Sequence, residues 1–397
     1  MIVEKMKGLG TTRSRIRELF EYGLSQAAVV GKENVFDFSI GNPSIPAPDA
    51  VADAVRDLLR MDSLSLHGYT PAGGAPNVRR AIAEDLSARS GDAIRPENIF
   101  VTCGAAPGIT AVMHALAVED AEFMLLAPYF SEYPAYAALT GAKVVVVPAD
   151  TKHFQIRIDE VEKRITPHTQ AIVVNSPNNP SGVIYSRETL KALAEVLSRK
   201  GDAYGHPIYI IADEPYRELV YDGEDTPYLP AIYPNTVICY SYSKSLSMPG
   251  ERIGYVCVPD CAADSADLYA AIAGAARAIG HVCAPSLLQQ VIARCVHLRP
   301  DVAPYDRNRV TLYDELTAIG YRCIKPKGAF YMLVEAPNGD SEAFSERAKA
   351  KNVLVVPTDG FGCPGFVRIS TCVSHDMIVR SIPSFRALWE EYQNERQ

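Results

Sequence analysis

Residues 208–219 read IYIIADEPYREL, an apolar run that ends abruptly at Asp213. No polar residue alternates with the apolar ones, and this pattern is typical of a strand buried on both faces of a sheet. Six more runs of this kind lie between residues 95 and 260: NIFVT (98–102), FMLLA (123–127), KVVVVP (143–148), AIVVN (171–175), TVICY (236–240) and IGYVCV (253–258). Helical patterns separate several of them, so the sequence predicts an α/β fold with a mostly parallel, seven-stranded sheet.

The pattern changes beyond residue 260. An alanine-rich stretch, DSADLYAAIAGAARAI (264–279), predicts a helix that leaves the sheet domain, and the part from about residue 300 mixes helical and strand patterns. A chain of 397 residues is long enough for two domains. We therefore expect a large domain over residues 46–295 and a smaller α+β domain formed by the N-terminal segment, 1–45, and the C-terminal part, 296–397.

Composition and charge argue against several classes of protein. The chain is 48% hydrophobic and 22% charged, with a net charge of −8, which disfavours nucleic acid as a partner. The N-terminus lacks the apolar segment of a signal peptide, and no apolar run approaches the ~20 residues of a membrane span. The nine cysteines and eight histidines show no metal-ligand spacing. We expect a cytoplasmic protein with reduced thiols, no bound metal and no membrane contact.

Ligands of open α/β sheets bind beyond the carboxyl ends of the strands, so the residues that follow each strand are candidates for a site. Gly104, Ala105 and Ala106 follow the first strand and open a helical pattern, where backbone N–H groups and the helix N-terminus attract an anion. Phe130 could stack on a flat ring, and Asn179 could donate a hydrogen bond. Taken singly, each feature is as well explained by a tight turn or by aromatic packing in the core.

Two further strands end in charged or hydroxyl-bearing segments. Asp213 ends an apolar strand, where an unpaired carboxylate is costly, and Tyr216 follows three residues later. After TVICY comes SYSKSLSMPGERIGY (241–255), in which Lys244 can form a Schiff base if its pKa is lowered. The other polar residues of this segment that can bind a phosphate are Ser241, Ser243 and Arg252. A helix cap and a surface turn are the structural alternatives for these segments.

All of these features fall at the same edge of the predicted sheet, and one ligand would use them together. Pyridoxal 5′-phosphate (PLP) carries an aldehyde, a phosphate, a phenolic oxygen and a basic nitrogen on one aromatic ring. It requires a lysine for its Schiff base and an acidic partner for the ring nitrogen. The conjunction therefore favours PLP as the cofactor.

With these residues in place, the chain resembles the fold-type I PLP-dependent aminotransferases of class I and II, which include aspartate aminotransferase. The likeness covers nearly the whole chain and rests on SYSKSLSMPGERIGY, ADEPYREL (212–219), NNPSG (178–182), SIGNPSIPAP (39–48), YTPAGGAPNVRRAIA (69–83), GAFYMLVE (328–335) and GFVRIS (365–370). It implies a role in amino acid metabolism or biosynthesis. The implied reaction is ping-pong transfer of an amino group between an L-amino acid and a 2-oxo acid, with aspartate and glutamate as candidate substrates.

The resemblance also implies roles for individual residues. Lys244 would hold the cofactor and move a proton between substrate and cofactor, and Asp213 would pair with the ring nitrogen. Asn179 and Tyr216 would hydrogen-bond the phenolic oxygen, and Phe130 would stack on the ring. The implied phosphate ligands are Gly104, Ala105, Ala106, Ser241, Ser243, Arg252 and, from the neighbouring subunit of a homodimer with shared active sites, Tyr69.

On the substrate side, the resemblance implies that Arg368 binds the α-carboxylate with help from the backbone near Gly41. Arg277 lies near the place where one branch of the family presents an arginine from the partner subunit to a distal carboxylate; an exposed charge on an alanine-rich helix is the alternative. Two residues depart from the family pattern. Thr358 replaces a usual glycine, and Ala106 stands where an aspartate-specific branch has a lysine.

Two other functions fit parts of the pattern. A PLP-dependent carbon–sulfur β-lyase on the same fold would keep Lys244, Asp213 and Arg368 but release pyruvate and ammonia from a cysteine-type substrate. A non-enzymatic regulator built around an aminotransferase-like domain needs a DNA-binding helix-turn-helix ahead of that domain, and the loop that begins near residue 39 leaves no room for one.

Overall fold

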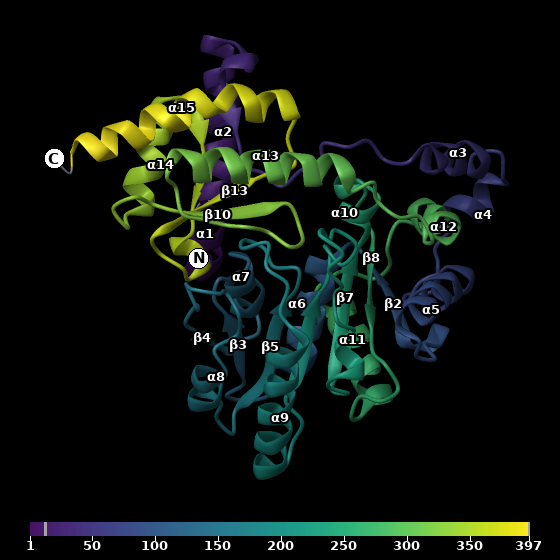
Figure 1. The fold of residues 1–397 in the computed structure, drawn as a ribbon. Coiled ribbons are helices and arrows are strands. Elements are labelled where there is room, and N and C mark those ends of the chain that lie inside the picture. Colours follow the sequence, from purple (N-terminus) through teal and green to yellow (C-terminus); the bar gives the residue numbers. More distant parts are fainter. Residues whose placement is uncertain (12–13, 396–397) are drawn as a thin grey trace.

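A seven-stranded sheet forms the centre of the large domain in the computed structural model, which describes residues 1–11 and 14–395 (Figure 1). The strands lie in the order β2-β8-β7-β6-β5-β3-β4. β8 is antiparallel to both of its neighbours, and the other pairs are parallel. The strands are β2 (Ile99–Thr102), β3 (Glu122–Leu126), β4 (Lys143–Val147), β5 (Thr169–Asn175), β6 (Tyr209–Asp213), β7 (Thr236–Ser241) and β8 (Gly254–Cys257). The predicted α/β fold with a mostly parallel, seven-stranded sheet is confirmed.

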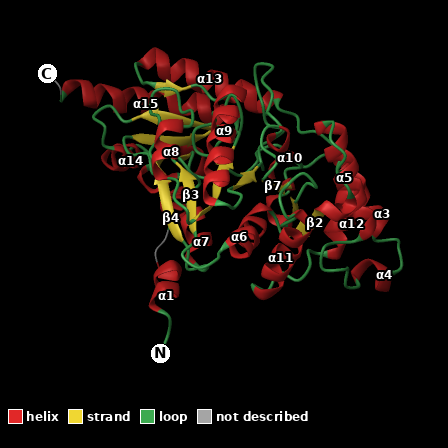
Figure 2. Cartoon of the chain, turned by 90° about the horizontal axis from the view of Figure 1, so that it is seen from below, coloured by secondary structure: helices red, strands yellow, loops and turns green. Residues whose placement is uncertain are grey.

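Helices cover both faces of this sheet (Figure 2). The helices packed on one face are α5 (Pro76–Ser90), α8 (Ile158–Arg164), α9 (Arg187–Tyr204) and α12 (Ser286–Cys295). Those on the other face are α6 (Ala105–Leu116), α7 (Tyr133–Ala138) and α11 (Ser265–Ala278). Because helices cover both faces, every residue of β3 and β6 is buried, as their continuous apolar runs predict.

Two expectations about these elements are wrong. The alanine-rich helix α11 does not leave the sheet domain, since Leu268 and Ile272 pack in the same apolar core as α6. The run KVVVVP is not buried on both faces, because β4 lies at the edge of the sheet and pairs only with β3. Val146 is consequently 38% exposed. Whether a strand lies at the edge of a sheet depends on the order of the strands, and the composition of the strand itself does not reveal that order.

Segments from both ends of the chain form a second body beside the sheet (Figure 1). β1 (Phe36–Asp37) pairs in parallel with β11 (Val353–Leu354). An antiparallel sheet follows the order β12 (Val356–Pro357), β13 (Phe366–Ser370), β10 (Tyr331–Glu335), β9 (Cys323–Ile324). The accompanying helices are α2 (Arg15–Val30), α13 (Ala303–Ile319), α14 (Ser341–Ala350) and α15 (His375–Asn394). We call this body the small domain below; the pairing of β1 with β11 brings N-terminal residues next to C-terminal ones.

The remaining helices are short or peripheral. They are α1 (Glu4–Thr11), α3 (Asp49–Leu58), α4 (Ser63–His67) and α10 (Tyr242–Ser245), with 3₁₀ turns η1 (Lys32–Asn34), η2 (Pro96–Asn98), η3 (Leu229–Ala231), η4 (Pro249–Glu251) and η5 (Asp359–Phe361). Within residues 1–11 and 14–395, no helix is both long enough and apolar enough to cross a membrane.

Candidate active site

A cavity of 580 Å³ lies where the carboxyl ends of the central strands meet the small domain. Most of the predicted site residues line it: Gly41, Ala105, Ala106, Phe130, Asn179, Asp213, Tyr216, Ser241, Ser243, Lys244, Arg252 and Arg368. Gly104 is buried directly beside Arg252. Tyr69 and Arg277 are exposed and do not line this cavity. Their assignment to the site of a neighbouring subunit stays a prediction.

Lys244 lies on the one-turn helix α10, directly after β7, and its side chain reaches toward the small domain. Its Nζ donates a hydrogen bond of 2.6 Å to the carbonyl of Gly41 and lies 5.4 Å from the centre of the Phe330 ring. Burial lowers the pKa of Lys244 to about 8, and the neighbouring cations Arg368 and Arg252 act in the same direction. A substantial share of this amine is therefore neutral near pH 8, as a Schiff-base nucleophile requires.

Asp213 ends β6 at the floor of the cavity and is 5% exposed. Its Oδ2 accepts a hydrogen bond of 2.5 Å from the hydroxyl of Tyr133, whereas its Oδ1 has no partner. Burial raises the pKa of Asp213 to about 7, Glu214 adds to the rise, and the bond from Tyr133 opposes it. A buried carboxylate oxygen without a donor is costly. The arrangement fits a ligand that brings a cationic N–H group, such as the protonated ring nitrogen of PLP.

A chain of buried amides links Asp213 to the substrate side of the cavity. Asn175 donates from Nδ2 to the carbonyl of Asp213 at 2.8 Å, and its Oδ1 accepts from the backbone N–H of Asn179 at 2.7 Å. The Asn179 side chain in turn accepts from Arg368 at 3.1 Å. Since Oδ1 of Asn179 is engaged in this way, its Nδ2 group is the one available as a donor to a phenolic oxygen.

Arg368 projects from β13 and is 1% exposed. Its Nη2 donates to the carbonyl of Ser39, and its guanidinium lies 4.5 Å from the Tyr331 ring and 5.4 Å from the Phe361 ring. The Nε group is buried without a hydrogen-bond partner. A buried guanidinium with an unsatisfied donor suits a carboxylate, which accepts two parallel hydrogen bonds from such a group.

The strand-to-helix turn at Gly104 forms an anion cradle with Arg252. Gly104 has a φ of 103°, and a Cβ atom at this position would lie 2.6 Å from Nη2 of Arg252. Arg252 donates to Ser243 Oγ at 3.3 Å, and the hydroxyls of Ser241 and Ser243 are 2.6 Å apart. The N-terminus of α6 begins immediately after Gly104. Hydroxyls, a guanidinium and a helix N-terminus that converge in this way fit a phosphate group.

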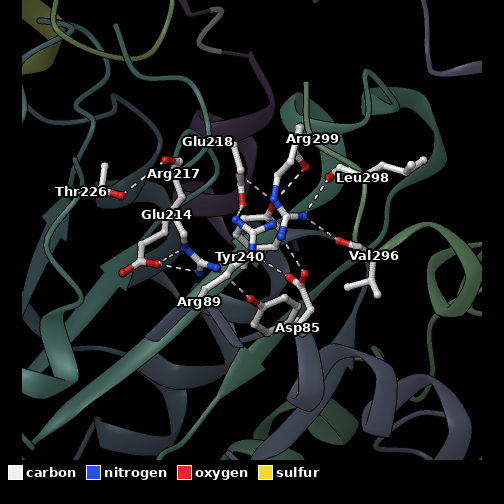
Figure 3. Close-up of polar contacts among 12 residues, drawn as sticks. Asp85, Arg89, Glu214, Arg217, Glu218, Thr226, Tyr240, Val296, Leu298 and Arg299 are labelled. Atoms are coloured by element: carbon white, nitrogen blue, oxygen red, sulfur yellow. Dashed lines mark hydrogen bonds and ion pairs between the residues drawn. The ribbon is translucent and has the colours of Figure 1, made fainter. Parts of the chain in front are cut away.

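A buried network of charged side chains supports the loop that follows Asp213 (Figure 3). Arg217 pairs with Glu214 at 2.6 Å and lies 4.5 Å from the Tyr240 ring. Glu218 pairs with Arg89 of α5 at 2.8 Å and accepts from the Tyr240 hydroxyl at 2.9 Å. The same hydroxyl lies 2.8 Å from Oγ of Ser245, the residue after Lys244. The network therefore connects the Asp213 loop to the Lys244 segment beneath the cavity.

The structure also explains one departure from the family pattern and reveals site residues that the sequence did not identify. Thr358 is fully buried, and its hydroxyl bonds to the carbonyls of Cys363 and Phe366, so it holds the turn that carries Phe361. The residues missed by sequence reasoning are Ser14, Ile16, Arg17 and Phe20 of the α2 region, together with Tyr133, Asn175 and Tyr331. Asn175 is the last residue of β5, and Tyr133 begins the helix after β3, so attention to every strand end could have found them. The α2 residues carry no such signal.

The fold and the site together define a PLP-dependent enzyme of fold type I. A buried lysine of lowered pKa, an unpaired carboxylate oxygen and an anion cradle occupy one cavity, and each matches a different group of that cofactor. Among the described residues, no three His, Cys, Asp or Glu side chains are grouped so that they could hold a metal ion.

Comparisons with known proteins identify the family. Residues 33–382 match the family described as aminotransferase class I and II. A probable aspartate/prephenate aminotransferase of Aquifex aeolicus is 34% identical over 379 residues, which cover 90% of this chain and 92% of the relative. The crystal structure of an aminotransferase from Eubacterium rectale is 54% identical with a TM-score of 0.97 over 99% of both chains. The structure of Thermus thermophilus aspartate aminotransferase with maleate is 26% identical, with a TM-score of 0.85 over 98% of this chain and 99% of that one.

The chain belongs to the class I and II aminotransferases. It is a transferase that uses PLP. These relatives are named as enzymes of amino-group transfer, so the regulator and the β-lyase are not favoured.

Proposed function

We propose that the enzyme transfers the amino group of aspartate or glutamate to a 2-oxo acid in two half-reactions of ping-pong type. The buried guanidinium of Arg368, bonded to Asn179 on the wall of the Lys244 cavity, carries this proposal. It lies where the α-carboxylate of an amino acid must be held if its α-carbon is to approach Lys244. The names of the relatives, which include aspartate and prephenate aminotransferases, support this substrate class.

PLP, when bound, supplies the group that takes up the amino nitrogen and withdraws electrons from the α-carbon. The residues of this chain do the rest. Arg368 would bind the α-carboxylate, with Gly41 beside it, and Lys244 would hold the cofactor and act as the base that moves the proton of the substrate α-carbon. Asp213 would accept a hydrogen bond from the ring nitrogen and so keep that nitrogen protonated.

The other predicted residues hold and orient the cofactor in this proposal. Asn179 and Tyr216 would donate to the phenolic oxygen, and Phe130 would cover the ring. The residues that would surround the phosphate are Gly104, Ala105, Ala106, Ser241, Ser243 and Arg252. The geometry of the anion cradle supports this assignment. We further infer a cytoplasmic homodimer in which Tyr69 of each chain reaches the phosphate in the other site and Arg277 lies near the other substrate. The domain limits 1–45, 46–295 and 296–397 belong to the same proposal.

Single half-reactions test the proposal. Purified enzyme is mixed with one amino acid and no oxo acid, and the absorbance of the cofactor is followed. Aspartate and glutamate should convert the cofactor stoichiometrically and release one equivalent of their oxo acids. Lys244→Ala should bind the cofactor without a lysine linkage, and borohydride should attach the cofactor of the wild type to Lys244. Labelling of another lysine, or pyruvate release from cysteine without an acceptor, would contradict the proposal.

A further inference from the structure

We propose that Arg17, at the start of α2, binds the distal carboxylate of a dicarboxylic substrate within the same subunit. The inference rests on the proposed function and adds the residue that selects the side chain. A dicarboxylate bound in this cavity presents two anionic groups in addition to the cofactor phosphate. The cationic side chains that line the cavity are Arg17, Lys244, Arg252 and Arg368.

Three of these cations already have a partner of defined chemistry. Arg252 belongs to the anion cradle, Lys244 to the cofactor aldehyde and Arg368 to the α-carboxylate. Arg17 is the cation that remains, and its guanidinium has no hydrogen-bond or ion-pair partner within residues 1–11 and 14–395. The lining contains one further carboxylate besides Asp213, that of Glu132, and no ion pair joins it to Arg17.

Packing places the first turn of α2 next to the arginine that holds the α-carboxylate. Leu19 is 1% exposed and forms an apolar cluster with Val356 and Phe361, and Ile16 packs against this cluster. The ring of Phe361 lies 5.4 Å from the guanidinium of Arg368. Arg17 follows Ile16 directly and is therefore fixed to the same part of the small domain as Arg368.

Arg15, two residues before Arg17, lies on a different face of α2 and contacts the small domain instead of the cavity. Arg15 pairs with Glu342 and Glu346 of α14 at 2.6 and 2.9 Å and with Glu18 at 3.1 Å. These pairs tie the helix to the small domain. Arg17 lines the cavity instead, together with Ser14, Ile16 and Phe20.

This setting suits recognition of a carboxylate. Arg17 is exposed where it lines the cavity, and the half-buried side chains of Ile16 and Phe20 line the cavity with it. Its guanidinium can therefore pair with a carboxylate that enters from solvent without first losing another partner. Both Arg17 and Arg368 belong to the small domain and line the same cavity, so the packing of that domain sets the distance between them. Arg277 of a partner subunit would serve the same group from another chain, and the two assignments make different predictions.

The test compares substrates that differ only in the distal carboxylate. Aspartate and 2-aminobutyrate are used as amino donors for the wild-type holoenzyme, Arg17→Met, Arg17→Lys, Arg277→Met and, as a control at a remote exposed site, Arg199→Met. Methionine keeps an apolar stem and removes the charge. For Arg17→Met we expect kcat/KM for aspartate to fall by about 10- to 150-fold, the effect of losing one charge-assisted hydrogen bond. The value for 2-aminobutyrate should change by less than about threefold, and Arg17→Lys should recover part of the loss.

Equal losses on the two substrates, or a selective loss in Arg277→Met and not in Arg17→Met, would overturn the assignment. Succinate binding to the holoenzyme, measured by calorimetry, is decisive without turnover: its Kd should rise about tenfold or more in Arg17→Met. If the wild type accepts neither aspartate nor glutamate, the proposed function fails. An unchanged succinate Kd would then overturn the inference about Arg17 separately.

Discussion

Replacement of Asp213 by asparagine should stabilise the cofactor-free enzyme and harm the holoenzyme. Burial raises the pKa of Asp213 from its ordinary value of 3.8 to about 7. Each tenfold change in proton affinity corresponds to about 1.4 kcal/mol, so ionisation of this buried carboxyl costs the cofactor-free fold about 4 kcal/mol above pH 7. Asparagine avoids this cost. Its Oδ1 can still accept the hydrogen bond from Tyr133.

The pH dependence gives this prediction its sign. Between pH 3.8 and about 7, the unfolded chain releases a proton that folded Asp213 keeps. The unfolding free energy of the wild type therefore falls as the pH rises through this window, and it levels off above pH 7. Relative to wild type, the cofactor-free Asp213→Asn variant should gain about 2 kcal/mol at pH 5.5 and about 4 kcal/mol at pH 8.5. For a chain of this length these gains correspond to rises in Tm of about 2.5 and 5 °C.

Differential scanning calorimetry of both proteins at the two pH values measures this effect. With saturating PLP the order should reverse, because the wild-type carboxylate then accepts a hydrogen bond from the protonated ring nitrogen. The transamination rate of the variant should fall by about 100-fold or more, since a charge-assisted bond to the ring nitrogen is lost. Equal Tm values for the two cofactor-free proteins at both pH values would refute the argument about Asp213.

Three further substitutions test other parts of the site. Arg368→Lys removes the bidentate donor and should lower kcat/KM by about 100-fold for every amino donor, whatever its side chain, in steady-state kinetics. Tyr133→Phe removes the hydroxyl that donates to Asp213 and should therefore raise the pKa of Asp213 further. Calorimetry of the cofactor-free variant should then show a larger loss of Tm at pH 8.5 than at pH 5.5. Glu218→Gln removes one of the two carboxylates that pair with Arg89 at 2.8 Å and leaves Asp85 as the other, so it should cost about 2 kcal/mol, a fall in Tm of about 2.5 °C. A loss no larger than that of the exposed control Glu195→Gln would contradict this role of the network.

Local patterns determined the strands and the chemistry that follows them. Apolar runs without alternation predicted strands buried on both faces, and β3 and β6 have this burial because helices cover both sides. The residues directly after the strands could be predicted as site residues for a geometric reason. Parallel strands deliver their carboxyl ends to one edge, so Asn179, Asp213 and Lys244 had to lie near one another.

Strand order and long-range contacts could not be predicted from these local patterns. The edge position of β4 depends on which strand β3 pairs with, and the docking of α11 on α6 depends on a helix face that its alanine-rich composition does not reveal. The same limit applied to α2. Nothing in its sequence indicates that its first turn borders a cavity whose other lining residues extend along the chain from Ile40 to Arg368.

The sequence by itself thus determined the fold class and the cofactor, and it predicted the residues proposed to hold that cofactor, because each depends on short segments with strong local chemistry. Only the tertiary structure decided how these segments act on one another. The carbonyl of Gly41 meets Nζ of Lys244, and a Cβ at Gly41 would collide with the Tyr331 hydroxyl. Burial moves the pKa of Asp213 to about 7, although the hydrogen bond from Tyr133 acts in the opposite direction. These properties arise from desolvation and from contacts between distant segments, which exist only in the folded chain.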